Sequence, residues 1–138
     1  MTPLAVGIDL VEVRRVQEAI ERTPQLEQRA FTASEIRYCR AAQSPWQRFA
    51  ARWAAKEAVV KCLGGGVPGF ELTDIEVVHD ADGAPMVRLS GRAADRARDR
   101  GIDRWLLSMT HVAEMAQATA IALGDSGRTA AGEVDASR

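Results

Sequence analysis

The sequence has few cysteines, and the two it has follow no recognisable pattern. Cys39 and Cys62 are the only cysteines in 138 residues. Their spacing matches no metal-ligand motif, and they do not make a disulfide framework. We therefore expect two packed or half-exposed thiols in a reducing compartment.

Long apolar runs and an excess of one charge are also missing. No stretch approaches the roughly 20 apolar residues that span a membrane, and the N-terminus lacks the basic-then-apolar layout of a signal peptide. The formal net charge is −1, so no global basic field favours nucleic acid. Aromatic residues make up only 5% of the chain, which leaves few rings on which bases could stack. These absences predict a soluble cytoplasmic protein.

The residues that are present predict one compact domain. A content of 46% hydrophobic and 27% charged residues is ordinary for a globular chain. Apolar periodicity favours helices over residues 11–22, after a capping box at Thr32 and Glu35, from Pro45 to the glycines at 64–66, and over 91–101. The expected strands are residues 4–11, 74–79, 85–90, 105–110 and 116–123.

The order of these elements favours an α+β fold, because helices come early and antiparallel strands come late. Residues 74–79 and 85–90 flank Asp82-Gly83, which is a strong hairpin signal. We expect a folded domain over residues 1–123. Residues 124–138 have almost no large apolar groups and are expected to be a disordered tail.

Two carboxylates lie in apolar surroundings. Glu57 falls between Trp53 and Ala50 in helical projection, and Asp9 interrupts the run "VGIDLV". Burying an unpaired carboxylate costs several kcal/mol, so each should be protonated, paired or bound to a cation. Glu57 could form an i,i+4 ion pair with Lys61, worth roughly 0.3–0.5 kcal/mol if exposed. Asp9 could simply cap the helix that follows it.

Taken together, the two carboxylates suggest a Mg²⁺ site that draws further ligands from water and a substrate phosphate. Arg52, Lys56 and Lys61 lie on the same helix, and Gly64-Gly65-Gly66 follows it. Cations and exposed backbone amides beside a metal describe a pocket for a phosphorylated substrate. The glycines do not form a Walker loop, and a helix stop explains them equally well.

His111 is expected in the connection between the last two strands, with Ser108 and Thr110 nearby. A lone histidine is more often structural than catalytic. The sequence contains no nucleophile-elbow serine and no legible Cys–His pair, which argues against a covalent acyl-enzyme mechanism.

Four segments follow one another in a distinctive order: "GIDLVEVRRV" (7–16), "FTASEIRYC" (31–39), "RFAARWAAKEAVVKCLGGG" (48–66) and "LSMTHVAEMAQATAIAL" (107–123). Together they resemble the holo-[acyl-carrier-protein] synthase family of short 4'-phosphopantetheinyl transferases. The most specific parts are G-I-D-x-x-E and A-A-K-E-A-x-x-K, followed by S-x-T-H. The resemblance covers about residues 4–123.

The resemblance implies transfer of 4'-phosphopantetheine from coenzyme A to a serine of an apo acyl carrier protein, with release of adenosine 3',5'-bisphosphate. It also implies a Mg²⁺ requirement and a homotrimer whose active sites are shared between subunits. Fatty-acid synthesis is the default setting, with polyketide or other secondary-metabolite carriers as the alternatives.

Carried over residue by residue, the resemblance assigns Asp9 and Glu57 as metal ligands. Lys61 would contact the phosphates of coenzyme A, and Glu57 and His111 are alternative candidates for activating the serine hydroxyl. The other implied roles are coenzyme A binding by Arg52, His111, Gly64, Gly65 and Gly66, and carrier docking by Arg15 and Arg22.

Two other functions remain open at this point. A small metal-dependent nucleotide phosphohydrolase would use the same carboxylates without a protein acceptor, but the usual run of glutamates on one helix is missing. A non-catalytic assembly module of the same fold would have little reason to keep Asp9 and Glu57 in apolar places.

Overall fold

Three long strands form an antiparallel sheet in the order β1-β5-β4. They are β1 (Thr2–Glu12), β4 (Ile102–His111) and β5 (Met115–Gly124). The structure is a computed structural model that describes residues 1–65 and 70–125. It confirms the α+β class, and each of the three strands is longer than its apolar core predicted.

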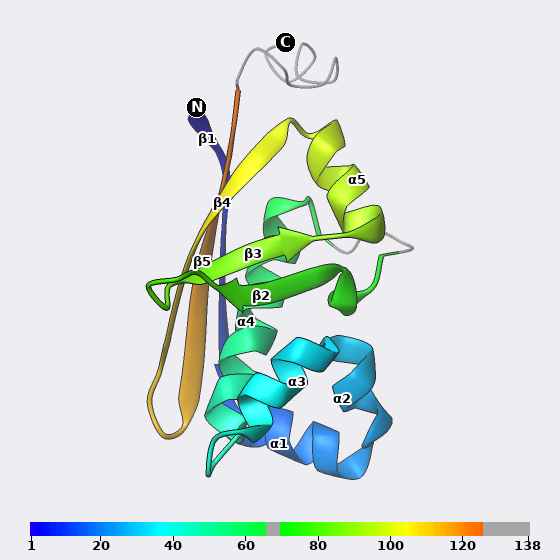
Figure 1. Cartoon of the computed structure of the whole chain (residues 1–138), viewed down its shortest axis with the longest axis vertical. Helices are drawn as coiled ribbons and strands as arrows, with labels where there is room; N and C mark the ends of the chain where they lie inside the picture. Colours follow the sequence, from blue (N-terminus) through cyan, green and yellow to red (C-terminus); the bar gives the residue numbers. More distant parts are fainter. Residues whose placement is uncertain (66–69, 126–138) are drawn as a thin grey trace.

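The longest helix, α4 (Trp46–Cys62), packs against one face of this sheet (Figure 1). The packing is close because the contacting side chains are small. Every second residue of β5 from Ala116 to Ala122 is a buried alanine. On β1, a Cβ added at Gly7 would lie 1.9 Å from the carbonyl oxygen of Ala58. Only a glycine therefore lets β1 and α4 approach so closely.

Three short helices gather at one end of α4 (Figure 1): α1 (Val13–Arg22), α2 (Gln25–Ala30) and α3 (Ala33–Arg40). A second apolar cluster, which includes Phe31 and Phe49, fills the space between them. The sequence predicted α1 and α3 but not α2, because the break at Thr23-Pro24 is followed by only six helical residues. The predicted capping box of Thr32 and Glu35 is present at the start of α3.

The remaining elements form the predicted hairpin and its flanks. A single 3₁₀ turn, η1 (Leu72–Asp74), leads into β2 (Ile75–His79), which pairs with β3 (Pro85–Leu89). The helix α5 (Gly91–Asp99) follows and lies at the opposite end of the molecule from α1–α3 (Figure 1).

The structure corrects two boundaries. His111 was expected in a connection, but it is the last residue of β4 and pairs with Ala116. Gly124 was assigned to the tail, but it belongs to β5, where it pairs with Thr2. The rest of the predicted tail, from residue 126, lies outside the described residues.

The sheet face turned away from α4 carries several exposed apolar side chains. Side chains alternate across a strand, and on β1 this alternation leaves Val6, Ile8 and Leu10 exposed by 68%, 57% and 62%. Leu106 of β4 is 47% exposed and lies opposite Ile121, which also pairs with Val6. We call Val6, Ile8, Leu10 and Leu106 the open sheet face.

Within the described ranges, Cys39 and Cys62 are free and buried, which agrees with the expectation of packed thiols. None of the described helices is long and apolar enough to cross a membrane.

Candidate active site

Asp9 and Glu57 line the same cavity, which has a volume of about 520 Å³. Asp9 comes from β1, Glu57 comes from α4, and α1 closes the cavity from a third side. Trp53, one helical turn before Glu57, contributes to the wall. The fold therefore brings together the two carboxylates that the sequence marked as misplaced.

Lys61 pairs with Asp9 and not with Glu57. Its Nζ lies 3.5 Å from Asp9 Oδ1 and donates to the carbonyl oxygen of Ile8 at 2.6 Å. In the part of the chain that the structure describes, no hydrogen bond or ion pair joins Lys61 to Glu57. The simple i,i+4 explanation of Glu57 is therefore wrong.

Asp9 does not fit its simple explanation either. It lies inside β1 opposite Ala118, and the N-cap residue of α1 is Glu12. Its side chain keeps 21% exposure and is open to the cavity. Asp9 is therefore not a helix cap.

The pKa of Glu57 is raised above its ordinary value. Burial is the largest cause and the negative charge of Asp9 is the second, while Lys61 acts in the opposite direction. A cation at this position would relieve the repulsion between the two carboxylates. The described residues contain no cluster of three or more metal-ligating side chains, so such a cation would take its other ligands from water or substrate.

The first helix supplies one of its two candidate docking residues to this cavity. Arg15 lines the cavity beside Asp9 and Glu57. Arg22 lies exposed in the last turn of α1. Arg15 therefore combines a position in the cavity with a position on the helix surface.

His111 lies away from the two carboxylates within one chain. It is exposed at the end of β4, on the far side of β5 from β1, because Ala116 pairs with Val11 on one side and with His111 on the other. It is not among the described residues that line the cavity.

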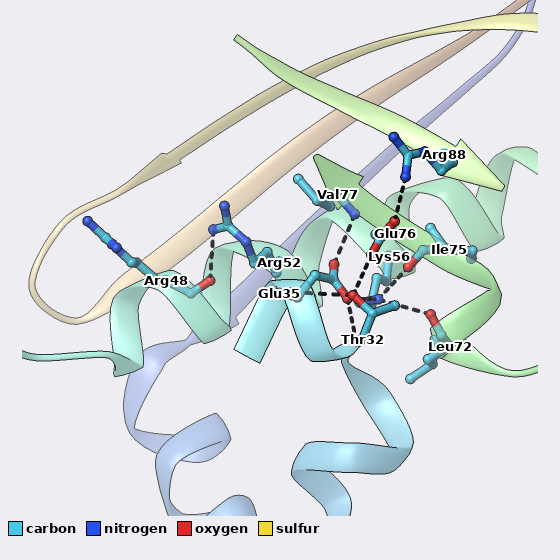
Figure 2. A network of polar contacts seen from close by, with 10 residues as sticks. All are labelled: Thr32, Glu35, Arg48, Arg52, Lys56, Leu72, Ile75, Glu76, Val77 and Arg88. Carbon is cyan, nitrogen blue, oxygen red and sulfur yellow. Dashed lines mark hydrogen bonds and ion pairs between the residues drawn. The ribbon is translucent and has the colours of Figure 1, made fainter. Parts of the chain in front are cut away.

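Arg52 also points elsewhere. Its guanidinium stacks on the ring of Tyr38 at 4.1 Å, approaches His79 Nε2 at 3.4 Å, and donates to the carbonyl oxygen of Arg48 at 3.4 Å (Figure 2 shows the Arg48 contact). Arg52 Nε is buried without a hydrogen-bond partner among the described residues. The guanidinium of Arg48 also stacks on Tyr38, 4.2 Å from the ring centroid. The result is an arginine pair around an aromatic ring.

The described part of the glycine-rich loop starts in a left-handed conformation, with φ of 95° at Gly64 and 90° at Gly65. Two arginines of the α5 region hold this start. Arg96 Nε donates to the carbonyl oxygen of Leu63 at 2.9 Å, and Arg100 Nη1 does so at 3.4 Å. The third glycine, Gly66, lies outside the described residues.

Lys56 does not face the cavity, contrary to the expectation that it adds a cation to a phosphate pocket. Its side chain is fully buried and pairs with Glu35 of α3 at 2.8 Å. Consecutive helical residues point about 100° apart, so Lys56 and Glu57 serve different sides of α4. The sequence did not reveal this partner, because the capping box already explained Glu35.

Comparison with known proteins identifies the family. The profile of the 4'-phosphopantetheinyl transferase superfamily matches residues 5–117. A holo-[acyl-carrier-protein] synthase of Desulforudis audaxviator is 46% identical over 124 residues, covering 89% of this chain and 95% of the relative.

The chain belongs to the 4'-phosphopantetheinyl transferase superfamily. Solved structures of phosphopantetheinyl transferases agree with its fold. The holo-[acyl-carrier-protein] synthase of Neisseria meningitidis superimposes with a TM-score of 0.80 at 28% identity, covering 88% of this chain and 99% of that one. The Helicobacter pylori enzyme in complex with coenzyme A gives 0.74 at 27% identity, covering 86% and 100%.

Membership makes the chain a phosphopantetheinyl transferase, and the geometry shows which predicted residues a single chain brings together. Asp9, Arg15 and Glu57 line one cavity. Lys61 does not line it but forms an ion pair with Asp9. Arg52 and His111 lie elsewhere in the chain. Sequence reasoning missed Arg48 and Arg96, because arginines are ordinary on helix surfaces. Only the structure shows that Arg48 stacks on Tyr38 and that Arg96 binds the carbonyl oxygen of Leu63.

Proposed function

We propose that this chain transfers the 4'-phosphopantetheine group of coenzyme A to a serine hydroxyl of an apo acyl carrier protein and releases adenosine 3',5'-bisphosphate. The observation that carries the proposal is the cavity shared by Asp9 and Glu57 in a chain whose relatives are named holo-[acyl-carrier-protein] synthases. The coenzyme A complex of the Helicobacter pylori relative supports coenzyme A as the donor.

Mg²⁺ fits the donor set of this cavity. Carboxylate oxygens are its preferred protein ligands, and the pKa of Glu57 is raised partly by the charge of Asp9. We propose that Asp9 and Glu57 hold the ion. When bound, it would neutralise charge on phosphoryl oxygens.

The side chains of this subunit supply the rest of the chemistry. Lys61 is 53% exposed, so its ammonium can turn from Asp9 to the phosphates of coenzyme A at little desolvation cost. Charge stabilisation and positioning provide most of the catalysis in phosphoryl transfer. Glu57 is the first candidate to accept the serine proton, directly or through a nearby water, and His111 is the second candidate.

A homotrimer accounts for the open sheet face. Val6, Ile8, Leu10 and Leu106 form an exposed apolar strip of the kind that marks an interaction surface, and a second copy of the chain would bury it. We propose that the neighbouring subunit also brings Arg52 and His111 to the cavity of Asp9 and Glu57. The buried Nε of Arg52, which has no hydrogen-bond partner among the described residues, supports a role in binding an anionic part of coenzyme A.

We further propose that the acidic carrier protein docks on α1, where Arg15 and Arg22 are exposed. Arg22→Glu should raise the KM for carrier protein at least about tenfold and leave the KM for coenzyme A unchanged. Equal increases in both would contradict docking. We place the reaction in the cytoplasm, with fatty-acid synthesis as the first setting to examine.

Mass spectrometry of the carrier tests the proposed reaction. Incubation with coenzyme A, Mg²⁺ and apo carrier protein should add one phosphopantetheine to the carrier, and EDTA should abolish the addition. No mass change across a panel of fatty-acid and polyketide carriers would refute the proposal. Hydrolysis of coenzyme A without a carrier would instead favour the phosphohydrolase.

Sedimentation and subunit mixing test the trimer. Val6→Arg should yield monomers, whereas Met86→Arg, a matched change at an exposed apolar residue of the hairpin, should leave the trimer intact. Mixed trimers of Glu57→Gln and His111→Ala subunits should regain activity that neither variant has alone. A monomeric wild type, or no recovery on mixing, would contradict the shared site.

A further inference from the structure

Among the described residues, Lys56 and Glu35 carry the most deeply buried charges, and the proposed reaction uses neither of them. Lys56 Nζ lies 2.8 Å from Glu35 Oε1, and both side chains are 0% exposed. They join α4 to α3 on a different side of α4 from the cavity of Asp9 and Glu57.

Every hydrogen-bonding group of the pair has a partner (Figure 2). The three Lys56 protons go to Glu35 Oε1, to the carbonyl oxygen of Leu72 at 3.0 Å, and to that of Ile75. Glu35 also accepts from the amides of Thr32 and Val77, each at 2.9 Å. The pair therefore connects α3, α4, η1 and β2 at one point.

A stable core does not require charges here. Burial lowers the pKa of Lys56, which reflects the cost of removing its ammonium from water. Apolar side chains of similar volume often replace a buried ion pair without loss of stability. An ion pair differs from an apolar pair in its directionality, because each bond fixes an orientation.

The orientation fixed here is that of α4 beside its catalytic residue. Lys56 immediately precedes Glu57, so a rotation of α4 that moved one would move the other. The carbonyls of Leu72 and Ile75 belong to the segment that returns from the glycine-rich loop. Lys56 therefore ties this returning segment to the turn of α4 that carries Glu57.

We propose that Lys56 and Glu35 form a positioning pair, which sets the rotation of α4 against the segment Leu72–Ile75 and so holds Glu57 in the cavity that Asp9 also lines. The inference rests on the proposed function, because it takes Glu57 as a metal ligand. Neither Lys56 nor Glu35 touches substrate in this scheme.

The double variant Lys56→Met with Glu35→Gln separates positioning from stability. It leaves no isolated buried charge, so its thermal midpoint should exceed that of Lys56→Met alone. It still lacks the bonds from residue 56 to Leu72 and Ile75. We therefore expect kcat to fall at least about tenfold, the usual cost of losing a group that orients a ligand, while the KM for carrier protein stays unchanged.

Two further measurements complete the experiment. The half-saturating Mg²⁺ concentration is read from tryptophan fluorescence of the free protein, because Trp53 lines the cavity, and it should rise at least about fivefold. Ile102→Ala, a buried change in β4 far from this pair along the chain, serves as the stability-matched control. Its kcat and Mg²⁺ response should remain those of the wild type.

The outcomes are decisive in both directions. If the double variant recovers wild-type kcat and Mg²⁺ response, or if Ile102→Ala loses as much of both, the pair is only structural and the proposal is overturned. If the wild type transfers nothing to any carrier, the proposed function fails, and the Mg²⁺ titration still decides whether the pair positions Glu57. Should Lys56→Met not fold, the double variant carries the comparison against the wild type.

Discussion

Two lysines of α4, five residues apart in the sequence, each pair with a carboxylate on another element, and the two pairs differ in exposure. Lys61 and Asp9 are 53% and 21% exposed, and their closest atoms are 3.5 Å apart. Lys56 and Glu35 are both 0% exposed, at 2.8 Å. Water can replace either member of the first pair, but it cannot reach the second.

The difference separates two uses of the same chemistry. An exposed pair contributes little to stability, so Lys61 and Asp9 can exchange partners at little cost, as the proposed binding of phosphate and metal requires. A buried pair with every donor satisfied cannot exchange without a large cost. The first pair therefore suits a catalytic site, and the second suits the framework that holds such a site.

Unfolding experiments test this division, and the largest expected effect lies on the buried side. Lys56→Met should lower the free energy of unfolding by about 3–5 kcal/mol, because it leaves the Glu35 charge buried and unpaired. Lys61→Met should lower it by only about 0–1 kcal/mol. Urea denaturation at fixed protein concentration measures both, and equal losses would erase the distinction.

Transfer activity, unlike stability, should depend most on the residues that line the cavity. Glu57→Gln should reduce kcat by at least about 100-fold, because an amide is a poor metal ligand and proton acceptor. Its thermal midpoint near pH 8 should not fall. The folded-state pKa of Glu57 is raised by burial and by Asp9, so this group's contribution to stability decreases as pH rises through that pKa.

The control for this variant is the pH dependence of its stability, compared with that of the wild type. Wild-type protein should lose part of its stability relative to Glu57→Gln as pH rises above the ordinary range of a glutamate. Calorimetry across this pH range measures the difference. A Glu57→Gln protein that is inactive only because it melts early would contradict the assigned role.

Salt should produce the smallest effect. The stability difference between wild type and Lys61→Met should vanish in 1 M NaCl, where the screening length is about 3 Å. The difference between wild type and Lys56→Met should persist, because ions do not enter the core. Denaturation at low and high salt compares the two, and a salt-sensitive Lys56 would show that water reaches the pair.

The sequence was most informative where a residue contradicted its surroundings. Asp9 and Glu57 could be found because carboxylates are costly in an apolar strand and on an apolar helix face, and the fold places both on one cavity. Alternating alanines and the Asp82-Gly83 turn similarly predicted β5 and the hairpin. These signals are local, so they can be read along one segment.

Other features depend on contacts between distant segments and could not be read this way. Lys56 looked like a cation for a phosphate pocket, because its partner Glu35 already had a local explanation as a capping residue. Arg52 and His111 were grouped with Glu57 by resemblance, but neither of them lines the cavity of Glu57 in the described part of the chain. The helix α2 was not predicted, because its six residues are too few to show a helical periodicity.

The close approach at Gly7 has a consequence for how this enzyme can vary. The oxygen of Ala58 lies where a Cβ of residue 7 would be. Ala58 follows Glu57, and Gly7 lies two residues before Asp9. Any larger residue at position 7 would push α4 from β1 and separate the two carboxylates. The distance between Asp9 and Glu57, on which the proposed metal site depends, is therefore limited by the missing side chain at residue 7, and a substitution at Asp9 or Glu57 could not restore it.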